Sequence, residues 1–137
     1  MNFIFKLAFI PLLAASLPAQ GTVDTLGGTS SAPSRAALAK ANVIEVTKTV
    51  MLLKHEWYLS ITGAESLTFF RYRHHSQKGA YVKDWTKTVK VTGTGAGWYS
   101  PGPIALPMVA GNHYLMGVSW GGTVTYHYKI GTSGQKI

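Results

Sequence analysis

Side chains repeat with a period of two from residue 49 to residue 61. One face of this segment carries Lys54, Glu56 and Ser60. The opposite, mostly apolar face consists of Met51, Leu53, His55, Trp57, Leu59 and Ile61. A period of two indicates a β-strand with one buried face. We therefore expect a strand here, with its odd-numbered side chains in the core.

Similar segments recur along the chain, separated by clusters of turn residues. Further strands are expected at 43–47, 67–73, 80–92 and 104–109, and two more within 113–130. Turns or loops are expected at 62–66, 74–79, 93–103 and 110–112. In the strand at 67–73, the inward face is either Leu67, Phe69 and Arg71 or Thr68, Phe70 and Tyr72. The pattern predicts an all-β fold, an antiparallel β-sandwich of the jelly-roll or immunoglobulin-like type with about seven to eight strands.

The segment YLMGVSWGGTVTYHYKI at 114–130 predicts a hairpin. A two-residue turn would set apolar side chains opposite polar ones throughout. A three-residue loop at 121–123 instead sets Val118 opposite Tyr126 on an apolar face. Because a slip of one residue moves a whole face, the pattern favours the longer loop. Most of these aromatic side chains then belong to the core, and Trp120, at the tip, is the one expected to reach the surface.

The first nineteen residues have the layout of a secretory signal peptide. Lys6 lies in a short leading region, an apolar stretch follows, and small residues precede a cut after Ala19. The apolar stretch is too short to span a bilayer comfortably. We expect residues 1–19 to be removed and the protein to be secreted or at the cell surface. The chain has no Cys, and a secreted protein without disulfides points to a bacterial source.

Residues 20–41 are expected to form a flexible linker ahead of one β-sandwich domain at 42–137. Gly, Ser and Thr dominate its first part, and RAALAKAN at 35–42 has room for one or two helical turns. The formal net charge is +8, and loss of Lys6 leaves +7. Positive charge favours anionic glycans, cell walls, membranes or nucleic acid, and it also serves solubility. After residue 20 the sequence predicts no membrane span.

The chain also resembles a known class of module. The stretch GTGAGWYSPGPIALPMVAGNHYLMGVSWGGTVTYHY and the earlier EWYLSI and LTFFRY resemble the strands of secreted bacterial β-sandwich modules. The resemblance covers roughly residues 43–130 as a general pattern of strand and turn residues, and it includes no catalytic motif. It implies a jelly-roll-like accessory, adhesive or surface module. Arg71 departs from it, since an apolar residue is expected before Tyr72.

The sequence contains few residues that could carry out catalysis. The acidic residues are few, there is no Cys, and no G-x-S-x-G elbow is present. Glu56 and Asp84 are the pair that would serve glycoside cleavage if they lay several Å apart. Two solvated carboxylates on outward strand faces are the favoured interpretation. We expect no enzyme, and keep a small secreted hydrolase using Glu56 or Asp84, or self-assembly through open sheet edges, as alternatives.

Metal and nucleic-acid sites are also weakly indicated. His74 and His75 are adjacent and diverge, no H-x-H or H-E-x-x-H spacing exists, and acids are too sparse for a strong calcium site. We expect no metal and no cofactor. The stretch FFRYRHHSQK at 69–78 mixes aromatic and basic side chains, as single-stranded nucleic acid would require. In a secreted protein, a strand with a basic outer face explains it better, so no nucleic-acid partner is expected.

The strongest binding signal is the pair Trp98 and Tyr99 in GWYSPG. Aromatic faces stack on sugar rings by the same physics that packs cores. Adjacent side chains on extended backbone point opposite ways, so one is expected inward and one exposed. With Trp120, these are the predicted ligand-binding residues. We expect a secreted, non-catalytic binding or adhesive module whose partner is a polysaccharide, a cell-wall polymer or another surface protein.

Overall fold

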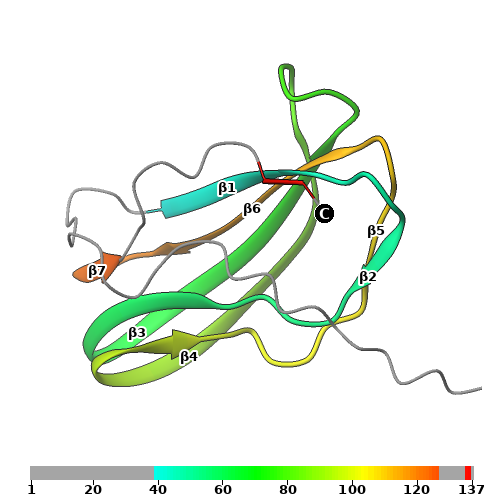
Figure 1. Cartoon of the computed structure of the whole chain (residues 1–137). Coiled ribbons are helices and arrows are strands. Elements are labelled where there is room, and N and C mark those ends of the chain that lie inside the picture. The colour runs from blue at the N-terminus through cyan, green and yellow to red at the C-terminus, as the bar shows by residue number, and fades with distance from the viewer. Residues whose placement is uncertain (1–38, 127–134, 137) are drawn as a thin grey trace, which may run out of the picture.

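The computed structural model describes residues 39–126 and 135–136, and every regular element among them is a β-strand (Figure 1). The strands are β1 (Ala39–Glu45), β2 (Val50–Leu52), β3 (Trp57–His74), β4 (Val82–Tyr99), β5 (Leu106–Met108), β6 (His113–Trp120), β7 (Val124–Tyr126) and β8 (Gln135–Lys136). The main sheet has the order β4-β3-β6-β1-β8, with β7 also paired to β3, and β2 and β5 form a separate ribbon. Only the β1–β8 pair among these described strands is parallel. The all-β, antiparallel class is confirmed.

The two ends of the chain bear on the expected boundaries. The signal peptide at 1–19 and the linker up to residue 38 lie outside the described residues. β1 begins at Ala39, so the linker ends earlier than expected, and the last part of RAALAKAN is strand rather than helix. The physical reason is tertiary pairing, because β1 is in register with β6 along its whole length, from Ala39 opposite Ser119 to Glu45 opposite His113.

β3 and β4 form one hairpin of two 18-residue strands. They pair from Trp57 opposite Tyr99 to Arg73 opposite Val82, with one irregularity after Arg71. The expected turn at 62–66 and most of the expected loop at 93–103 are therefore wrong, since both lie within this ladder. Their Gly, Ser and Thr residues mark a bend of the paired strands instead of a reversal of the chain.

Glycines occupy this bend. Gly63 lies opposite Gly93, and Gly63 and Gly95 have positive φ angles of 86° and 139°, a region that side-chain-bearing residues rarely adopt. Figure 1 shows β3 and β4 curling together before they run back beneath β6 and β1. Residues 62–66 are mostly exposed, whereas Ile61 and Leu67 on either side of them are buried. The bend thus divides the hairpin into two arms that share one core.

The core lies between these arms. Its main cluster combines Leu59 and Ile61 from the first arm with Leu67 and Phe69 from the second. β6 and β7 add Val118, Trp120, Val124 and Tyr126. A second cluster contains Ile44, Val46, Met108, Tyr114 and Met116. The inward face of β3 is therefore the one with Leu67, Phe69 and Arg71, which resolves the choice that the alternation left open.

The expected burial of the odd face fails at its beginning. Met51 and Leu53 are 54% and 49% exposed, whereas His55, Leu59 and Ile61 are buried. The alternation continues through residues 53–56, but the strand does not, because β2 leaves the main sheet and pairs with β5. Pro107 lies in β5, which fits a strand of a two-stranded ribbon because one side needs no N–H donor.

The expected hairpin at 114–130 is wrong in its pairing and right in its buried face. β6 pairs with the second arm of β3, and β7 continues along the first arm, with Val124 opposite Ile61 and Tyr126 opposite Leu59. Val118 lies opposite Phe69 instead of Tyr126. Residues 121–123 therefore bridge the bend, where the Gly121 N–H donates to Glu65 Oε1 at 3.4 Å. The last part of the expected second strand, 127–130, lies outside the described residues.

The bend generates a prediction at Gly93. A Cβ there would lie 2.5 Å from the Ile61 carbonyl oxygen and 2.6 Å from the Tyr99 hydroxyl. We expect Gly93→Ala to lower the free energy of unfolding by about 1–3 kcal/mol, as overpacking does. At Gly97, the same change meets only Tyr99 Cε2, at 3.8 Å, and should stay within about 0.5 kcal/mol of the parent protein. Urea unfolding of both variants checks this, and equal losses would contradict it.

Candidate functional site

Trp98 and Tyr99 lie at the end of β4, paired with Tyr58 and Trp57 of β3. Their expected place in a loop is wrong, but their expected orientations are confirmed. Trp98 is 48% exposed on the outer face, whereas Tyr99 is half-buried and packs against the main core cluster. The Tyr99 hydroxyl donates to the Gly95 carbonyl oxygen at 3.4 Å. Strand alternation, rather than loop geometry, turns the two side chains apart.

Tyr58 joins Trp98 to form an aromatic pair on the outer face of the first arm. Their ring centroids are 5.2 Å apart with planes at 64°, an edge-to-face arrangement. The next pair on the same face of the ladder is Ser60 opposite Ala96, two small residues. The Trp98 ring therefore stands next to low neighbours on one side. Tyr58 was not among the predicted binding residues, because the sequence does not show which strand pairs with Trp98.

Trp120 does not reach the surface. It is 5% exposed, lies opposite Leu67, and its ring centroid is 6.3 Å from that of Tyr126. The expectation of exposure depended on a hairpin tip, and the chain instead continues along β3 past Trp120. Trp120 is part of the main core cluster.

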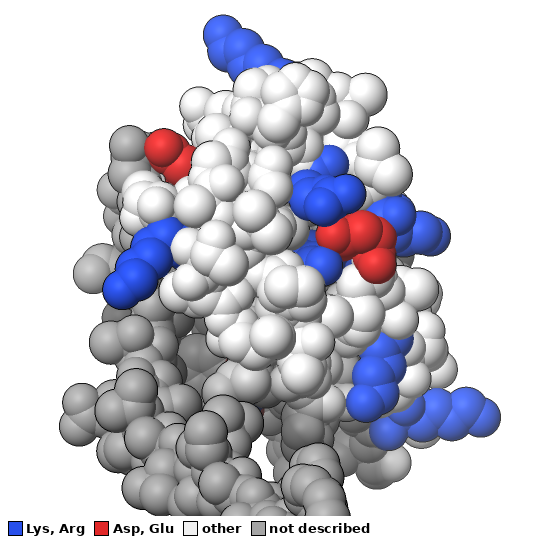
Figure 2. All heavy atoms as spheres, turned by 90° about the vertical axis from the view of Figure 1, so that its right-hand side faces the viewer, with Lys and Arg blue, Asp and Glu red and all other residues white. Residues whose placement is uncertain are grey.

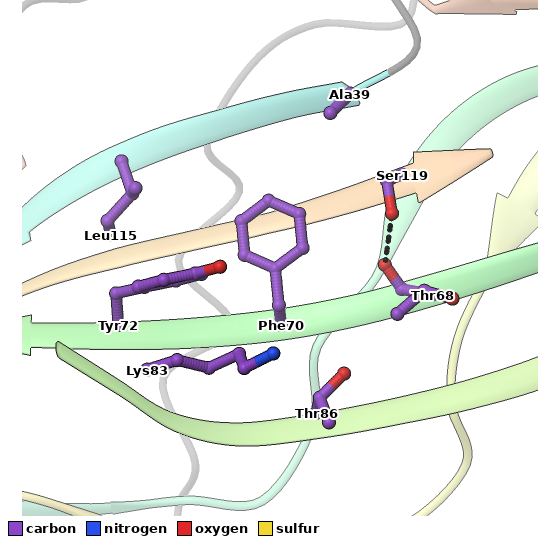
Figure 3. Close-up of a pocket in the computed structure, with 8 residues that line it drawn as sticks. All are labelled: Ala39, Thr68, Phe70, Tyr72, Lys83, Thr86, Leu115 and Ser119. Carbon is purple, nitrogen blue, oxygen red and sulfur yellow. Dashed lines mark hydrogen bonds between the residues drawn. The ribbon is translucent and has the colours of Figure 1, made fainter. Parts of the chain in front are cut away.

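A hollow lies on the outer face of the second arm, where β1, β6, β3 and β4 run side by side (Figure 3). Its volume is about 430 Å³, within the range of roughly 300–1,000 Å³ found for small-molecule sites. Phe70 and Tyr72 rise from β3 at its centre, Lys83 and Thr86 come from β4, and Leu115 and Ser119 come from β6. The sequence showed Phe70 and Tyr72 on one face, but four strands out of chain order form the hollow, so it was not foreseen.

The floor of the hollow is held by a close contact between Phe70 and Gly117. These residues pair across β3 and β6, and a Cβ on Gly117 would lie 2.5 Å from Phe70 Cζ and 2.7 Å from the Ala41 Cβ. The phenyl ring therefore takes the space that a side chain at 117 would fill. Tyr72 stands edge-to-face with Phe70 at 5.5 Å between ring centroids and 85° between planes.

Positive charge dominates the described surface. Figure 2 shows Lys and Arg side chains spread over one face of the molecule, with few acidic side chains among them. Lys83 lies in the hollow, and within the part of the chain that the structure describes its ammonium forms no ion pair or hydrogen bond. The neighbouring carboxylate, Asp84, does not neutralise it, because Asp84 is held elsewhere.

Asp84 is bound to the buried guanidinium of Arg71. Arg71 is 6% exposed, and its Nε and Nη2 donate to the two Asp84 carboxylate oxygens at 2.9 Å each. Its Nη1 donates to the Pro107 carbonyl oxygen at 2.9 Å, and the guanidinium carbon lies 5.0 Å from the Tyr114 ring centroid. Asp84 is an exposed residue, as expected, but its carboxylate is not free, because both oxygens accept hydrogen bonds from Arg71. It joins β4 to β3 and, through Arg71, to β5.

Glu56 also has a partner. Its Oε1 lies 3.0 Å from Lys54 Nζ, in a pair whose side chains are 28% and 66% exposed. Glu56 directly precedes the end of β3 that pairs with Tyr99, whereas Asp84 lies beside the opposite end of the same ladder. Each of the two candidate acids thus forms an ion pair of its own.

The histidines and acids form no metal cluster within the described ranges. No group of three His, Asp or Glu side chains is close enough there to hold an ion. His74 and His75 stack on each other at 4.2 Å between ring centroids, and Ser76 N–H donates to His74 Nδ1 at 3.0 Å. Residues 39–126 and 135–136 contain no helix that is long and apolar enough to cross a bilayer.

His55 is the buried titratable group whose environment is most unusual. It is 8% exposed, its ring lies 5.5 Å from the Phe69 ring, and its Nε2 accepts the Trp57 indole N–H at 2.8 Å. Its Nδ1 is buried without a partner among the described residues. Burial lowers the His55 pKa from its ordinary value of 6.5 to about 4. The imidazole is therefore neutral near pH 7, and this keeps its acceptor nitrogen available to Trp57.

Comparison with known proteins adds no relative. No protein-family model matches the chain, and neither a curated protein nor a solved structure matches it.

The Arg71–Asp84 pair predicts a large effect of removing one charge. Asp84→Asn leaves a buried guanidinium without its counter-charge, and we expect the free energy of unfolding to fall by about 3 kcal/mol. Glu56→Gln is the matched control, because it breaks an exposed pair and should cost less than about 1 kcal/mol. Chemical denaturation at neutral pH measures both. A loss at Asp84 no larger than that at Glu56 would show that the pair is not structural.

His55 predicts a pH dependence of stability. Its pKa is depressed in the fold, so the unfolded chain binds the extra proton between pH 6.5 and about 4, and stability falls as the pH drops through that window. Between about pH 7.5 and about pH 4.5, this contributes a loss on the order of 2 to 3 kcal/mol. His55→Gln, which retains an acceptor for Trp57, should lose that contribution, whereas His75→Gln, at an exposed site, should keep it. Urea unfolding at both pH values decides, and the same slope in all three proteins would refute the assignment.

Proposed function

We propose that this protein is a secreted, non-catalytic module that binds a polysaccharide or cell-wall polymer through the outer face of the first arm. The observation that supports this most is the exposed Trp98 ring, set edge-to-face against Tyr58 on paired strands. An indole offers a broad apolar face to the C–H groups of a sugar ring. The pair belongs to a long hydrogen-bonded ladder, so little conformational entropy is lost when the ligand stacks.

The remaining features are consistent with a binder. The signal-peptide layout at 1–19 supports export. The two acids weighed for hydrolysis are each engaged, Asp84 by Arg71 and Glu56 by Lys54. A retaining or inverting glycosidase needs two carboxyl groups facing one bond, and these two flank opposite ends of the β3–β4 ladder. The same aromatic pair could instead bind another surface protein, and a glycan-binding test distinguishes these two kinds of partner.

Self-association through a sheet edge is the second candidate. β4 is the outermost strand of the described main sheet and offers a long row of backbone groups beyond its pairing with β3. This edge strand carries three lysines, Lys83, Lys87 and Lys90. Lysines on an edge strand commonly prevent another strand from pairing with it. The edge therefore favours the monomeric binder over the assembling protein. Sedimentation of the purified protein at increasing concentration distinguishes them.

Trp98 supplies the test. We expect Trp98→Ala to weaken retention on insoluble cellulose, chitin or purified peptidoglycan, whichever the parent protein binds, by about three- to tenfold, because stacking on one aromatic is worth roughly 0.5–1.5 kcal/mol beyond area burial. Trp98→Tyr should retain part of the binding. The measurement is a depletion isotherm with each polymer.

Val82→Ala is the matched control. Val82 is 68% exposed on the same strand, far along the ladder from Trp98, and its truncation should leave binding unchanged. All variants should keep the parent melting temperature within a few degrees, since both side chains are exposed. If the parent protein binds none of the polymers or of a broad glycan array, or if Trp98→Ala binds as well as Val82→Ala, the proposal fails.

A further inference from the structure

We propose that the hollow on the outer face of the second arm is a separate binding site for a sugar unit that bears a carboxylate, such as a uronic acid within an acidic polysaccharide. The site goes beyond the Tyr58–Trp98 face and does not depend on it. Three properties of the hollow support the proposal: its aromatic walls, its unpartnered hydrogen-bond donors, and the single unneutralised cation within it.

The aromatic walls are held in position. Phe70 lies over Gly117 against Ala41, where any side chain at 117 would displace it. Tyr72 stands edge-to-face with Phe70, so the two rings form a corner instead of a flat surface. Such a corner offers an apolar face and an apolar edge to a ring-shaped ligand. Both residues are half-buried on a central strand, which limits their rotamers.

Two donors in the hollow lack partners. The Tyr72 hydroxyl and the Lys83 ammonium form no hydrogen bond or ion pair with the residues that the structure describes. Figure 3 shows both side chains extending the same way, toward Phe70 and Thr86. The surrounding hydroxyls already donate to backbone carbonyls, Thr86 to Phe69 at 3.2 Å and Ser119 to Thr68 at 3.4 Å. Their oxygens remain able to accept hydrogen bonds from sugar hydroxyls.

The charge selects the class of sugar. Lys83 brings one positive charge into the hollow, and Asp84, its neighbour in the chain, is held in a bidentate pair with Arg71. A carboxylate is the matching anion, and its pairing with Lys83 would add to the attraction of a protein with a net charge of +8. A phosphate-rich polymer carries a row of negative charges and is bound by several cations in line. The hollow is lined by one charged residue, Lys83, which suits a single carboxylate better.

The hollow and the Tyr58–Trp98 pair lie on different faces of the molecule. Odd-numbered side chains of both arms, such as Leu59 and Phe69, enter the same core cluster. The even-numbered faces of the two arms must then point away from each other. Tyr58 and Trp98 lie on one outward face, and Phe70 and Tyr72 lie on the other. A ligand in the hollow does not touch the Trp98 ring, so the two sites can be tested independently.

The experiment is calorimetric titration of the purified protein with short oligomers of galacturonate, mannuronate and guluronate, and with methyl-esterified oligogalacturonate as the uncharged counterpart. We expect at least one acidic oligomer to bind. We expect Lys83→Gln to weaken that binding by about two- to fivefold, the effect of one exposed ion pair, and the ester to bind weakly to both proteins. Backbone amide shifts in nuclear magnetic resonance spectra should move at Phe70, Tyr72 and Ser119.

Lys87→Gln is the matched control. Lys87 is an exposed lysine on the same strand, but its Nζ lies 3.9 Å from where a Cβ of Gly102 would be, on the other side of the sheet. We expect it to bind like the parent protein. Equal weakening by Lys83→Gln and Lys87→Gln would reveal only diffuse attraction and overturn the proposal. So would equal binding of acid and ester, or no binding of any acidic oligomer.

Trp98→Ala separates this proposal from the preceding one. It should leave binding of the acidic oligomer unchanged, even if it abolishes retention on an insoluble polymer. Loss of the acidic oligomer in Trp98→Ala, with shifts at Tyr58 instead of Phe70, would place that ligand on the first arm and overturn the assignment of the hollow. Conversely, the hollow can bind its ligand even if the Trp98 face binds nothing.

Discussion

The bend of the β3–β4 hairpin is the constraint on which the rest of the structure depends. The paired strands can bend sharply here because Gly63 adopts a positive φ of 86° and because Gly93, opposite it, has no room for a side chain beside the Ile61 carbonyl oxygen. Once the hairpin is bent, its inner faces enclose Leu59, Ile61, Leu67 and their neighbours, and β6 and β7 follow it from one arm to the other. Core, strand order and both outer faces are consequences of this one bend.

A buried guanidinium complements the apolar core. Arg71 stands on the inward face of β3, where an apolar residue was expected, and it is tolerated because its donors meet Asp84, Pro107 and the Tyr114 ring. Taking these charges out of water costs several kcal/mol, which the paired geometry offsets. The contact with Pro107 joins the main sheet to β5 of the β2–β5 ribbon. It adds a polar contact to the apolar packing of Met108 and Leu52, which lies against the second core cluster.

Local alternation predicted which side chains are buried better than it predicted which strands pair. Val118 and Tyr126 were both expected inward and both are buried, because the three residues at 121–123 preserve the parity of the face. That parity is the same whether the chain turns back or continues along a third strand, so the sequence pattern could not distinguish a hairpin from the observed arrangement. For the same reason the opposite orientations of Trp98 and Tyr99 were predictable, whereas their strand partners were not.

The bent hairpin also has a consequence for the order of folding. β3 and β4 are neighbours in the chain, so their long ladder can form after closure of a short loop. β1 and β6 are far apart in sequence, so Ile44 can pair with Tyr114 only after the chain between them has become compact. Contacts of such high sequence separation slow folding and come late. We therefore expect the hairpin to form first, whereas β1, which precedes it in the chain, can pair only once β6 is in place.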